Sequence, residues 1–277
     1  MATEPPQVEE PHSHGSRVRV CRPRGGPCNS SVTEFVADGA CGYRAGLGTL
    51  WEVNLPRHRS FGFDWRGIFW MPNRRVVVFI DYQNAYREAR RAFFDDENDP
   101  AIVGQFDPLA LAHALASKQT SSFPGEPRQL KELRIYCGLP DPVKQGQGYA
   151  ATSRQIGKWG SDPCVRVFAR PLRYPPGWPR EPTRQKGVDV WLAVHFLGMA
   201  IRRDYDIGIL ISRDTDLVPA LEEVQALGNT VACEVATWAS GRVGTGRLRT
   251  PPHPLWCHYL DLAAFQAMQD PRDYNVP

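Results

Sequence analysis

The chain has 277 residues, which is enough for one large domain with an extension or for two small domains. Its composition, with 42% hydrophobic, 23% charged and 10% aromatic residues, is near the average for globular proteins and excludes a wholly disordered, collagenous or coiled-coil chain. The formal net charge of +3 is too small to indicate a nucleic-acid partner by itself, so such evidence must come from where the charges lie.

The sequence predicts neither a membrane span nor a secretory signal. No apolar run reaches the length of a membrane span, and residues 1–15 contain no apolar core of the kind that a secretory signal needs. The seven cysteines are odd in number and scattered, which is a poor framework for disulfides. We therefore expect a soluble, cytoplasmic protein with reduced thiols.

Residues 1–70 show neither helical nor strand periodicity over a useful length and mix Pro, Gly, Ser and Arg with isolated aromatic residues. We expect an irregular or disordered extension there. Met71 stands directly before the first strand-like segment and is a candidate start, in which case residues 1–70 are not part of the native protein. Residues 71–270 are expected to form the folded domain.

Beyond Met71, apolar strands alternate with helices. The segment 75–80, in which β-branched and aromatic residues follow Arg75 without a break, is typical of a strand buried on both faces of a parallel sheet. Further strands are expected at 133–139, 164–170, 207–211 and 230–236, and helices at about 84–94, 107–118, 148–159, 187–203, 217–227 and 260–268. The proline-rich residues 171–182 predict a long extended loop. The pattern predicts an α/β domain with a doubly wound, mainly parallel five-stranded sheet in the order 3-2-1-4-5.

Aspartates stand at the carboxyl ends of two predicted strands. Asp81 directly follows the first strand, and Asp214 and Asp216 follow the fourth. Ligands of open α/β sheets bind beyond the carboxyl ends of the strands where the winding direction reverses, so these carboxylates converge if the two strands are neighbours. Asp189 lies in the first turn of the helix after the proline-rich loop and is expected to face the same edge.

Clustered carboxylates predict a metal site. Like charges raise one another's pKa unless a cation neutralises them, and ligands that offer only oxygen select Mg²⁺ or Mn²⁺ over zinc. Two such ions can hold and activate a water for attack on a phosphodiester, so hydrolysis of nucleic acid is the expected reaction. Asn84 is expected to hydrogen-bond a carboxylate or a metal-bound water, and Ser212 to contact a phosphate.

Several of these residues also fit simpler structural roles. Asp216 directly precedes a helix and can serve as its N-cap, and Asn84 fits a cap equally well. Asp189 can stabilise the N-terminus of its helix through the helix dipole. Asp81 and Asp214 fit a purely structural role less well, because aspartate is depleted in strands and both stand at strand ends.

Three motifs around these residues resemble those of the NYN domain, the LabA and limkain branch of the PIN-like nucleases. They are FIDYQN at 79–84, KGVDVWLAV at 186–194 and SRDTDL at 212–217, and they occur in the order of that family. The resemblance covers about residues 74–236. It implies a metal-dependent ribonuclease in which Asp81, Asp189, Asp214 and Asp216 bind Mg²⁺ or Mn²⁺ and Asn84 supports them.

Two positions depart from the pattern of the family. His195 stands where many members carry a further aspartate, and Arg213 stands where many carry glycine. His195 lies about 240° around the helix from Asp189, so a metal-ligand or proton-donor role competes with burial against the sheet. Arg213 is either a phosphate clamp or an exposed arginine at a strand end.

Basic residues are concentrated just before Asp189. Residues 154–186 contain eight Arg or Lys but only two acidic residues, and aromatic residues are interleaved with them. Arginines for phosphates and aromatic faces for stacked bases are what a single-strand groove requires. The candidate RNA-binding residues are Arg170, Arg173, Trp178, Arg180, Lys186, Ser212 and Arg213. The alternative is a solvated loop with tryptophans packed in the core.

The sequence therefore predicts an Mg²⁺- or Mn²⁺-dependent endoribonuclease, a hydrolase acting on single-stranded or looped RNA. One alternative is a catalytically weak RNA-binding or regulatory module of the same fold, for which His195 is the main support. Another is a phosphoesterase acting on a small phosphate, which the basic aromatic loop disfavours because a small ligand needs no extended groove. RNA is the expected partner, a homodimer is compatible with the sequence, and no membrane association is expected.

Overall fold

The computed structural model describes residues 73–94, 99–228, 230–242 and 246–276. The expected extension at 1–70 and the candidate start at Met71 lie outside these residues, so both remain predictions. Within the described ranges, no helix is long and apolar enough to cross a membrane.

Strands and helices alternate along most of the described chain. The strands are β1 (Arg74–Asp81), β2 (Arg128–Leu139), β3 (Val165–Pro171), β4 (Ile207–Ile211), β5 (Ala232–Trp238) and β6 (Trp256–Leu260). The helices are α1 (Tyr82–Phe93), α2 (Pro108–Ala116), α3 (Gly146–Trp159), α4 (Val188–Ile201), α5 (Val218–Ala226) and α6 (Leu262–Ala267). Two short 3₁₀ helices, η1 (Ala101–Gly104) and η2 (Thr215–Leu217), complete the set.

The strands form one parallel sheet in the order β3-β2-β1-β4-β5-β6. The α/β class and the expected order of the first five strands are confirmed, but the predicted number of strands was wrong because β6 was not expected. This edge strand has five residues, and Trp256 and Tyr259 are exposed. It therefore lacks the continuous apolar run that marks a central strand.

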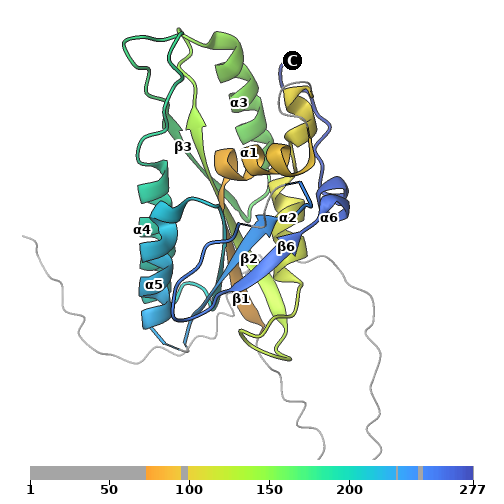
Figure 1. Cartoon of the computed structure of the whole chain (residues 1–277), viewed down its shortest axis with the longest axis vertical. Coiled ribbons are helices and arrows are strands. Elements are labelled where there is room, and N and C mark those ends of the chain that lie inside the picture. Colours follow the sequence, from red (N-terminus) through yellow and green to blue (C-terminus); the bar gives the residue numbers. More distant parts are fainter. Residues whose placement is uncertain (1–72, 95–98, 229, 243–245, 277) are drawn as a thin grey trace, which may run out of the picture. The chain divides into compact units, whose positions relative to one another are not determined.

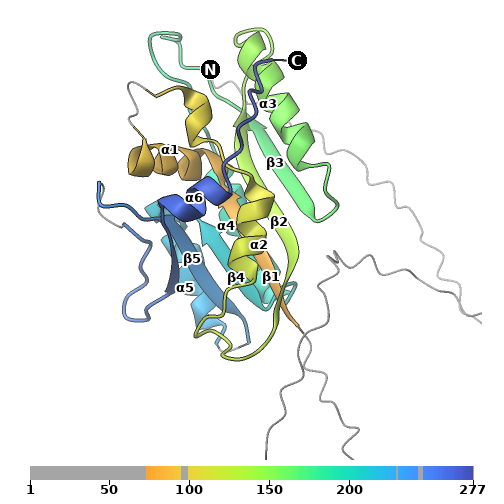
Figure 2. The same ribbon diagram turned by 90° about the vertical axis from the view of Figure 1, so that its right-hand side faces the viewer.

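Helices cover both faces of the sheet. Helices α1, α2, α3 and α6 lie on one face, and α4 and α5 lie on the other (Figures 1 and 2). The side chains of β1 alternate between the two layers, with Val76, Val78 and Ile80 in one core cluster and Val77 and Phe79 in the other. Because β1 is central, all of these residues are fully buried, as its apolar run predicts.

The direction of winding reverses between β1 and β4. The two strands pair directly, with Ile80 opposite Ile211, so their carboxyl ends are level. From this edge the chain continues into α1 on one face and through η2 into α5 on the other (Figure 2). Side chains that follow β1 and β4 are thus brought to the place where open α/β sheets bind ligands.

The proline-rich connection between β3 and α4 folds back on itself instead of remaining extended. Arg173 and Arg184 pair through two backbone hydrogen bonds of 2.9 Å. The Tyr174 hydroxyl accepts a hydrogen bond from the Asp141 N–H at 2.8 Å and donates one to Gln145 at 2.7 Å. These contacts fasten the first part of the connection and let residues 183–185 return toward α1, where they line a cavity.

Candidate active site

Three carboxylates meet beyond the carboxyl ends of β1 and β4. Asp189, Asp214 and Asp216 each offer an oxygen atom, and these atoms all lie within 4.8 Å of one another. Asp189 is in the first turn of α4, whereas Asp214 and Asp216 are at the start of η2. The structure therefore brings together three of the four predicted metal ligands in one cluster.

The fourth predicted ligand, Asp81, adjoins this cluster. It lines one cavity together with Asp214 and is 7% exposed. Burial and the negative charges of Asp214 and Asp189 raise the pKa of Asp81 to about 6, although the N–H of Asn84 and the charge of Arg87 act in the opposite direction. A positive ion at this edge would relieve the repulsion, because it favours the charged form of each carboxyl group.

The helix caps are not where the sequence suggested. Asp81 is the N-cap of α1, and its Oδ1 accepts a hydrogen bond of 3.2 Å from the N–H of Asn84. Asp214 is the N-cap of η2, and its Oδ1 accepts one of 3.1 Å from the N–H of Asp216. The cap interpretation of Asn84 and Asp216 was therefore wrong. Each capping carboxylate has a second oxygen that these bonds do not use.

The residues of the cluster fit a hard divalent cation. All three members offer carboxylate oxygens, the donors that Mg²⁺ and Mn²⁺ prefer. Ligand oxygens at about 2.1 Å from Mg²⁺ are at most about 4.2 Å apart, so the cluster needs only a small contraction. Asp216 is exposed, and its side chain has room to make this adjustment.

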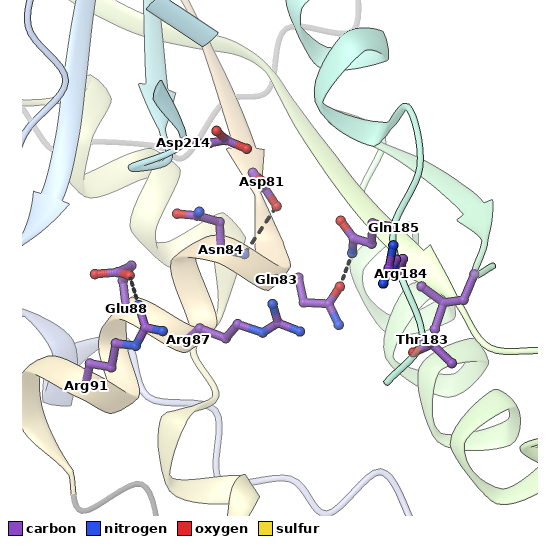
Figure 3. Close-up of a pocket in the computed structure, with 11 residues that line it drawn as sticks. Asp81, Gln83, Asn84, Arg87, Glu88, Arg91, Thr183, Arg184, Gln185 and Asp214 are labelled. Carbon is purple, nitrogen blue, oxygen red and sulfur yellow. Dashed lines mark hydrogen bonds and ion pairs between the residues drawn. The ribbon is translucent and has the colours of Figure 1, made fainter. Parts of the chain in front are cut away.

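A polar cavity of about 390 Å³ is lined by Asp81, Glu88 and Asp214 (Figure 3), and it is called the acidic cavity below. On one side it is lined by Gln83, Arg87 and Arg91, which are spaced four residues apart along one face of α1. On the other side it is lined by Thr183, Arg184 and Gln185. Among the described residues, Arg87 has no ion-pair partner. The cavity thus combines carboxylates that suit a cation with guanidinium groups that suit phosphate oxygens.

These wall residues were not predicted from the sequence. The spacing of Gln83, Arg87 and Arg91 was a usable signal, because residues four apart share a helix face and Asp81 immediately precedes the helix. Arg184 and Gln185 gave a weaker signal, since only the folded-back loop brings them opposite α1.

Three further contacts hold the loop that carries Asp214. The Oδ1 of Asn84 accepts a hydrogen bond from the N–H of Arg213, and the Ser212 hydroxyl accepts one of 3.1 Å from the N–H of Asp214. The Arg213 guanidinium forms an ion pair with Glu88 of α1. Ser212 is 4% exposed, so in this structure it supports the loop. The RNA contacts expected of Ser212 and Arg213 remain predictions.

The other candidate RNA-binding residues lie outside the acidic cavity. Arg173, Arg180 and Lys186 are exposed on the folded-back loop. Arg170 lies over the Trp191 ring at 5.2 Å and donates a hydrogen bond to the carbonyl of Gly187 at the start of α4. Trp178 packs edge-on against Tyr174, with their ring centroids 5.3 Å apart. Their contact with RNA is likewise untested.

His195 is outside the carboxylate cluster. Its Nδ1 is 2.9 Å from the Tyr136 hydroxyl, and its Nε2 accepts a hydrogen bond of 3.1 Å from the indole N–H of Trp191. Burial and the charges of Arg134 and Arg202 lower its pKa. Both ring nitrogens therefore have partners between α4 and the sheet, which favours the structural interpretation of this residue over a ligand role.

The sequence and the fold define a family. The model of the NYN domain matches residues 75–241, more than half of the chain, and the chain belongs to this family. NYN domains are part of the PIN-like superfamily, which has a nuclease-type fold, so the resemblance of the three motifs is confirmed.

Similarity to individual proteins is slight. No curated protein gives a significant match. A solved structure of a protein of unknown function from Vibrio parahaemolyticus is similar at 15% sequence identity, covering 59% of this chain and 81% of that chain with a TM-score of 0.37.

Proposed function

We propose that the protein is an Mg²⁺- or Mn²⁺-dependent ribonuclease that hydrolyses phosphodiester bonds of single-stranded or looped RNA. The observation that carries this proposal is the convergence of Asp189, Asp214 and Asp216 beside the buried Asp81, at the edge of a cavity lined with arginines. Membership of the NYN family supports the same class of reaction.

The residues divide into two groups with complementary charge. Asp189, Asp214, Asp216 and Asp81 would hold the cation, which supplies an activated water and neutralises charge on the phosphate when it is bound. Arg87, Arg91 and Arg184 would bind the non-bridging oxygens of the phosphate and its neighbours. Asn84 fixes the loop that carries Asp214 and would thereby position the carboxylate of Asp214 for the cation.

The wider RNA path is proposed to follow the basic loop. Arg173, Arg180 and Lys186 are exposed there, and Arg184 of the same loop lines the acidic cavity. A strand that contacts the first three would be led to the carboxylates. This arrangement favours a polynucleotide over a small phosphate, because a small ligand would gain nothing from charges beyond the cavity.

The alternative of a catalytically weak RNA-binding module loses its main support. His195, which replaces an aspartate found in many family members, packs against Tyr136 and Trp191 and is not part of the cluster. Its identity is therefore explained by packing and does not argue against catalysis. A cytoplasmic location and a homodimer remain predictions.

The proposal is tested by incubating the purified full chain with a labelled single-stranded RNA in Mn²⁺, in Mg²⁺ and in chelator. Cleavage with either cation and none in chelator is expected. Asp214→Asn, purified in the same way, should be inactive and controls for a contaminating nuclease, while Asp273→Asn in the C-terminal segment should retain activity. Equal cleavage by the wild type and Asp214→Asn would refute the proposal, and a DNA strand of the same sequence tests the sugar preference.

A further inference from the structure

A second cavity lies next to the acidic one, on the face of the sheet covered by α1 and α3. Its volume is about 160 Å³, space for roughly five water molecules at ~30 Å³ each. Its lining includes Tyr82 and Tyr86 from α1, Gln105 from the segment after η1, and Thr152, Gln155 and Trp159 from α3. We propose that this cavity binds one nucleobase of the RNA beside the phosphate that is cleaved. The proposal rests on the ribonuclease function proposed above.

The lining of the second cavity suits a neutral ring. None of its described lining residues is Asp, Glu, Lys or Arg, whereas three arginines line the acidic cavity. A phosphate would find no opposite charge in the second cavity, but a base needs none. The two cavities thus suit the phosphate and the base of a nucleotide.

Aromatic rings make up much of the wall. The ring centroids of Tyr82 and Trp159 are 4.3 Å apart, and those of Tyr82 and Tyr86 are 6.4 Å apart with nearly parallel planes. Aromatic faces stack on any base and are the usual platform for unpaired nucleotides. Such stacking requires a base that is not already in a duplex, which agrees with single-stranded or looped RNA as the substrate.

Two polar groups in the wall lack a partner. The side-chain Oε1 of Gln105 and the indole N–H of Trp159 are buried, and neither forms a hydrogen bond within the described part of the chain. Both atoms have almost no exposed surface, so an occupant reaches them once either side chain turns into the cavity, and it would then need both an acceptor and a donor group. The edges of all four nucleobases carry donors beside acceptors.

The two cavities share Gln83 in their walls. Gln83 lines both cavities and accepts a hydrogen bond from Gln185, which lines the acidic one (Figure 3). Gly138 at the end of β2 lines the second cavity, and a Cβ there would come within 3.0 Å of Gln185 and 2.4 Å of Leu172. Tyr82 and Gln83 also directly follow Asp81, so a base in the second cavity would lie beside the carboxylates.

Binding can be tested without catalysis. Nucleosides have no phosphate, so the arginines of the acidic cavity contribute nothing, and chelator removes any metal. Titration of the full chain with adenosine, guanosine, cytidine and uridine should show binding of at least one of them. Thr152→Phe, which fills the cavity, should abolish it. Gly157→Phe is the matched control, because a side chain at this position of α3 meets open space, and it should bind as the wild type does.

A second variant tests the polar wall without filling the cavity. Gln105→Leu removes the unpaired acceptor and keeps a side chain of similar size, so affinity for the preferred nucleoside should fall about tenfold. Thermal melts should show that both variants are folded. If no nucleoside binds to the wild type, or if Thr152→Phe binds as well as the wild type does, the base-binding proposal is wrong.

Cleavage then separates this proposal from the ribonuclease proposal. With random-sequence RNA and Mn²⁺, the wild type should prefer certain bases at one fixed position next to the cut, and Thr152→Phe should lose that preference while still cleaving. An abasic nucleotide at this position should slow cleavage by the wild type only. Cleavage with identical base profiles for both proteins overturns the base pocket and leaves the ribonuclease standing. Nucleoside binding without any RNA cleavage overturns the ribonuclease function and the role of the pocket in substrate choice.

Discussion

Asn84 of α1 accepts a hydrogen bond of 2.9 Å from the backbone N–H of Arg213, 129 residues away in the sequence. This bond joins the first turn after β1 to the loop after β4. Asp81 precedes that turn and Asp214 follows Arg213, so the bond holds together the two segments that carry these proposed metal ligands. It gives a physical reason for an asparagine three residues after the aspartate in the motif FIDYQN.

Asn84→Ala should therefore weaken metal binding more than it weakens the fold. The substitution removes one hydrogen bond and leaves the N–H of Arg213 unpaired, which should lower the free energy of unfolding by about 1 to 3 kcal/mol. Loss of a group that orients a ligand typically lowers metal affinity or activity about 10- to 100-fold. Cleavage rates as a function of Mn²⁺ concentration measure this, with Asn275→Ala in the C-terminal segment as control. Wild-type metal dependence in Asn84→Ala would contradict a positioning role.

Asp81→Asn and Asp214→Asn should separate catalysis from folding. Asparagine can still accept the capping hydrogen bond that each aspartate accepts, but it removes a negative charge that the cation needs. Cleavage should fall by several orders of magnitude. Mn²⁺ should raise the melting temperature of the wild type, because the cation binds the folded state and not the unfolded state. It should raise the melting temperature of the variants little or not at all.

The same variants carry a pH dependence in chelator. Because the pKa of Asp81 is raised to about 6 in the folded protein, the ionised carboxylate destabilises the metal-free fold at higher pH. Asp81→Asn should therefore melt above the wild type when the pH exceeds about 6, and this difference should shrink as the pH falls toward the pKa of an unfolded aspartate. A lower melting temperature at every pH, together with unchanged cleavage, would refute the metal-site assignment.

Arg87→Ala tests the phosphate wall. Arg87 lines the acidic cavity and has no ion-pair partner in the described ranges, so its removal should cost the fold little. Each phosphate contact contributes about one unit to the slope of log affinity against log salt, and the variant should lose about that much. Binding is measured by fluorescence anisotropy with RNA in chelator. Arg166→Ala, exposed on β3 and away from the cavity, should keep the wild-type slope.

The basic loop can be examined in the same assay. The double variant Arg173→Ala with Arg180→Ala should reduce the salt dependence of RNA binding, because each arginine is proposed to contact a phosphate. Both side chains are exposed, so the loop backbone should stay in place. Arg170→Ala is a less direct test, since Arg170 also lies over Trp191 and donates to the carbonyl of Gly187. An unchanged slope in the double variant would place the RNA elsewhere.

Local sequence was sufficient to predict most of the fold and to place the candidate metal ligands at one edge of the sheet. The run at 75–80 identified the central strand, and Asp81, Asp189 and Asp214 were found because strand ends and helix starts are local signals. The start of β2 at Arg128 was missed because it begins with charged and polar residues. The Arg128 side chain is buried there beside a distant partner of opposite charge, and no local pattern contains that information.

That partner, Glu234 of β5, is the buried centre of a polar network. It forms an ion pair of 3.0 Å with Arg128, lies 2.7 Å from Nε2 of His258 in β6, and accepts hydrogen bonds from Thr120 and Ser122. Burial raises its pKa, but these hydrogen bonds outweigh that effect and lower it to about 2. Folding therefore favours the ionised form of this carboxyl group.

The shift predicts a loss of stability in acid. A group whose folded pKa lies below its unfolded value stabilises the protein fully above the unfolded pKa, about 4.5 here, and this contribution is lost as the pH falls toward 2. It amounts to roughly 3 kcal/mol at neutral pH. Urea unfolding of the wild type between neutral pH and the acid range should show this decline.

Glu234→Gln tests the network directly. At neutral pH it should lower the free energy of unfolding by about 3 to 5 kcal/mol, because it leaves the charge of Arg128 buried with no opposite charge. The difference in free energy of unfolding between the wild type and the variant should narrow as the pH falls below about 4.5, because protonation also makes the wild-type side chain neutral. Glu222→Gln, at an exposed position of α5, should change the free energy by less than about 0.5 kcal/mol. A difference that stays constant from neutral pH into the acid range would show that the depressed pKa of Glu234 does not contribute to stability.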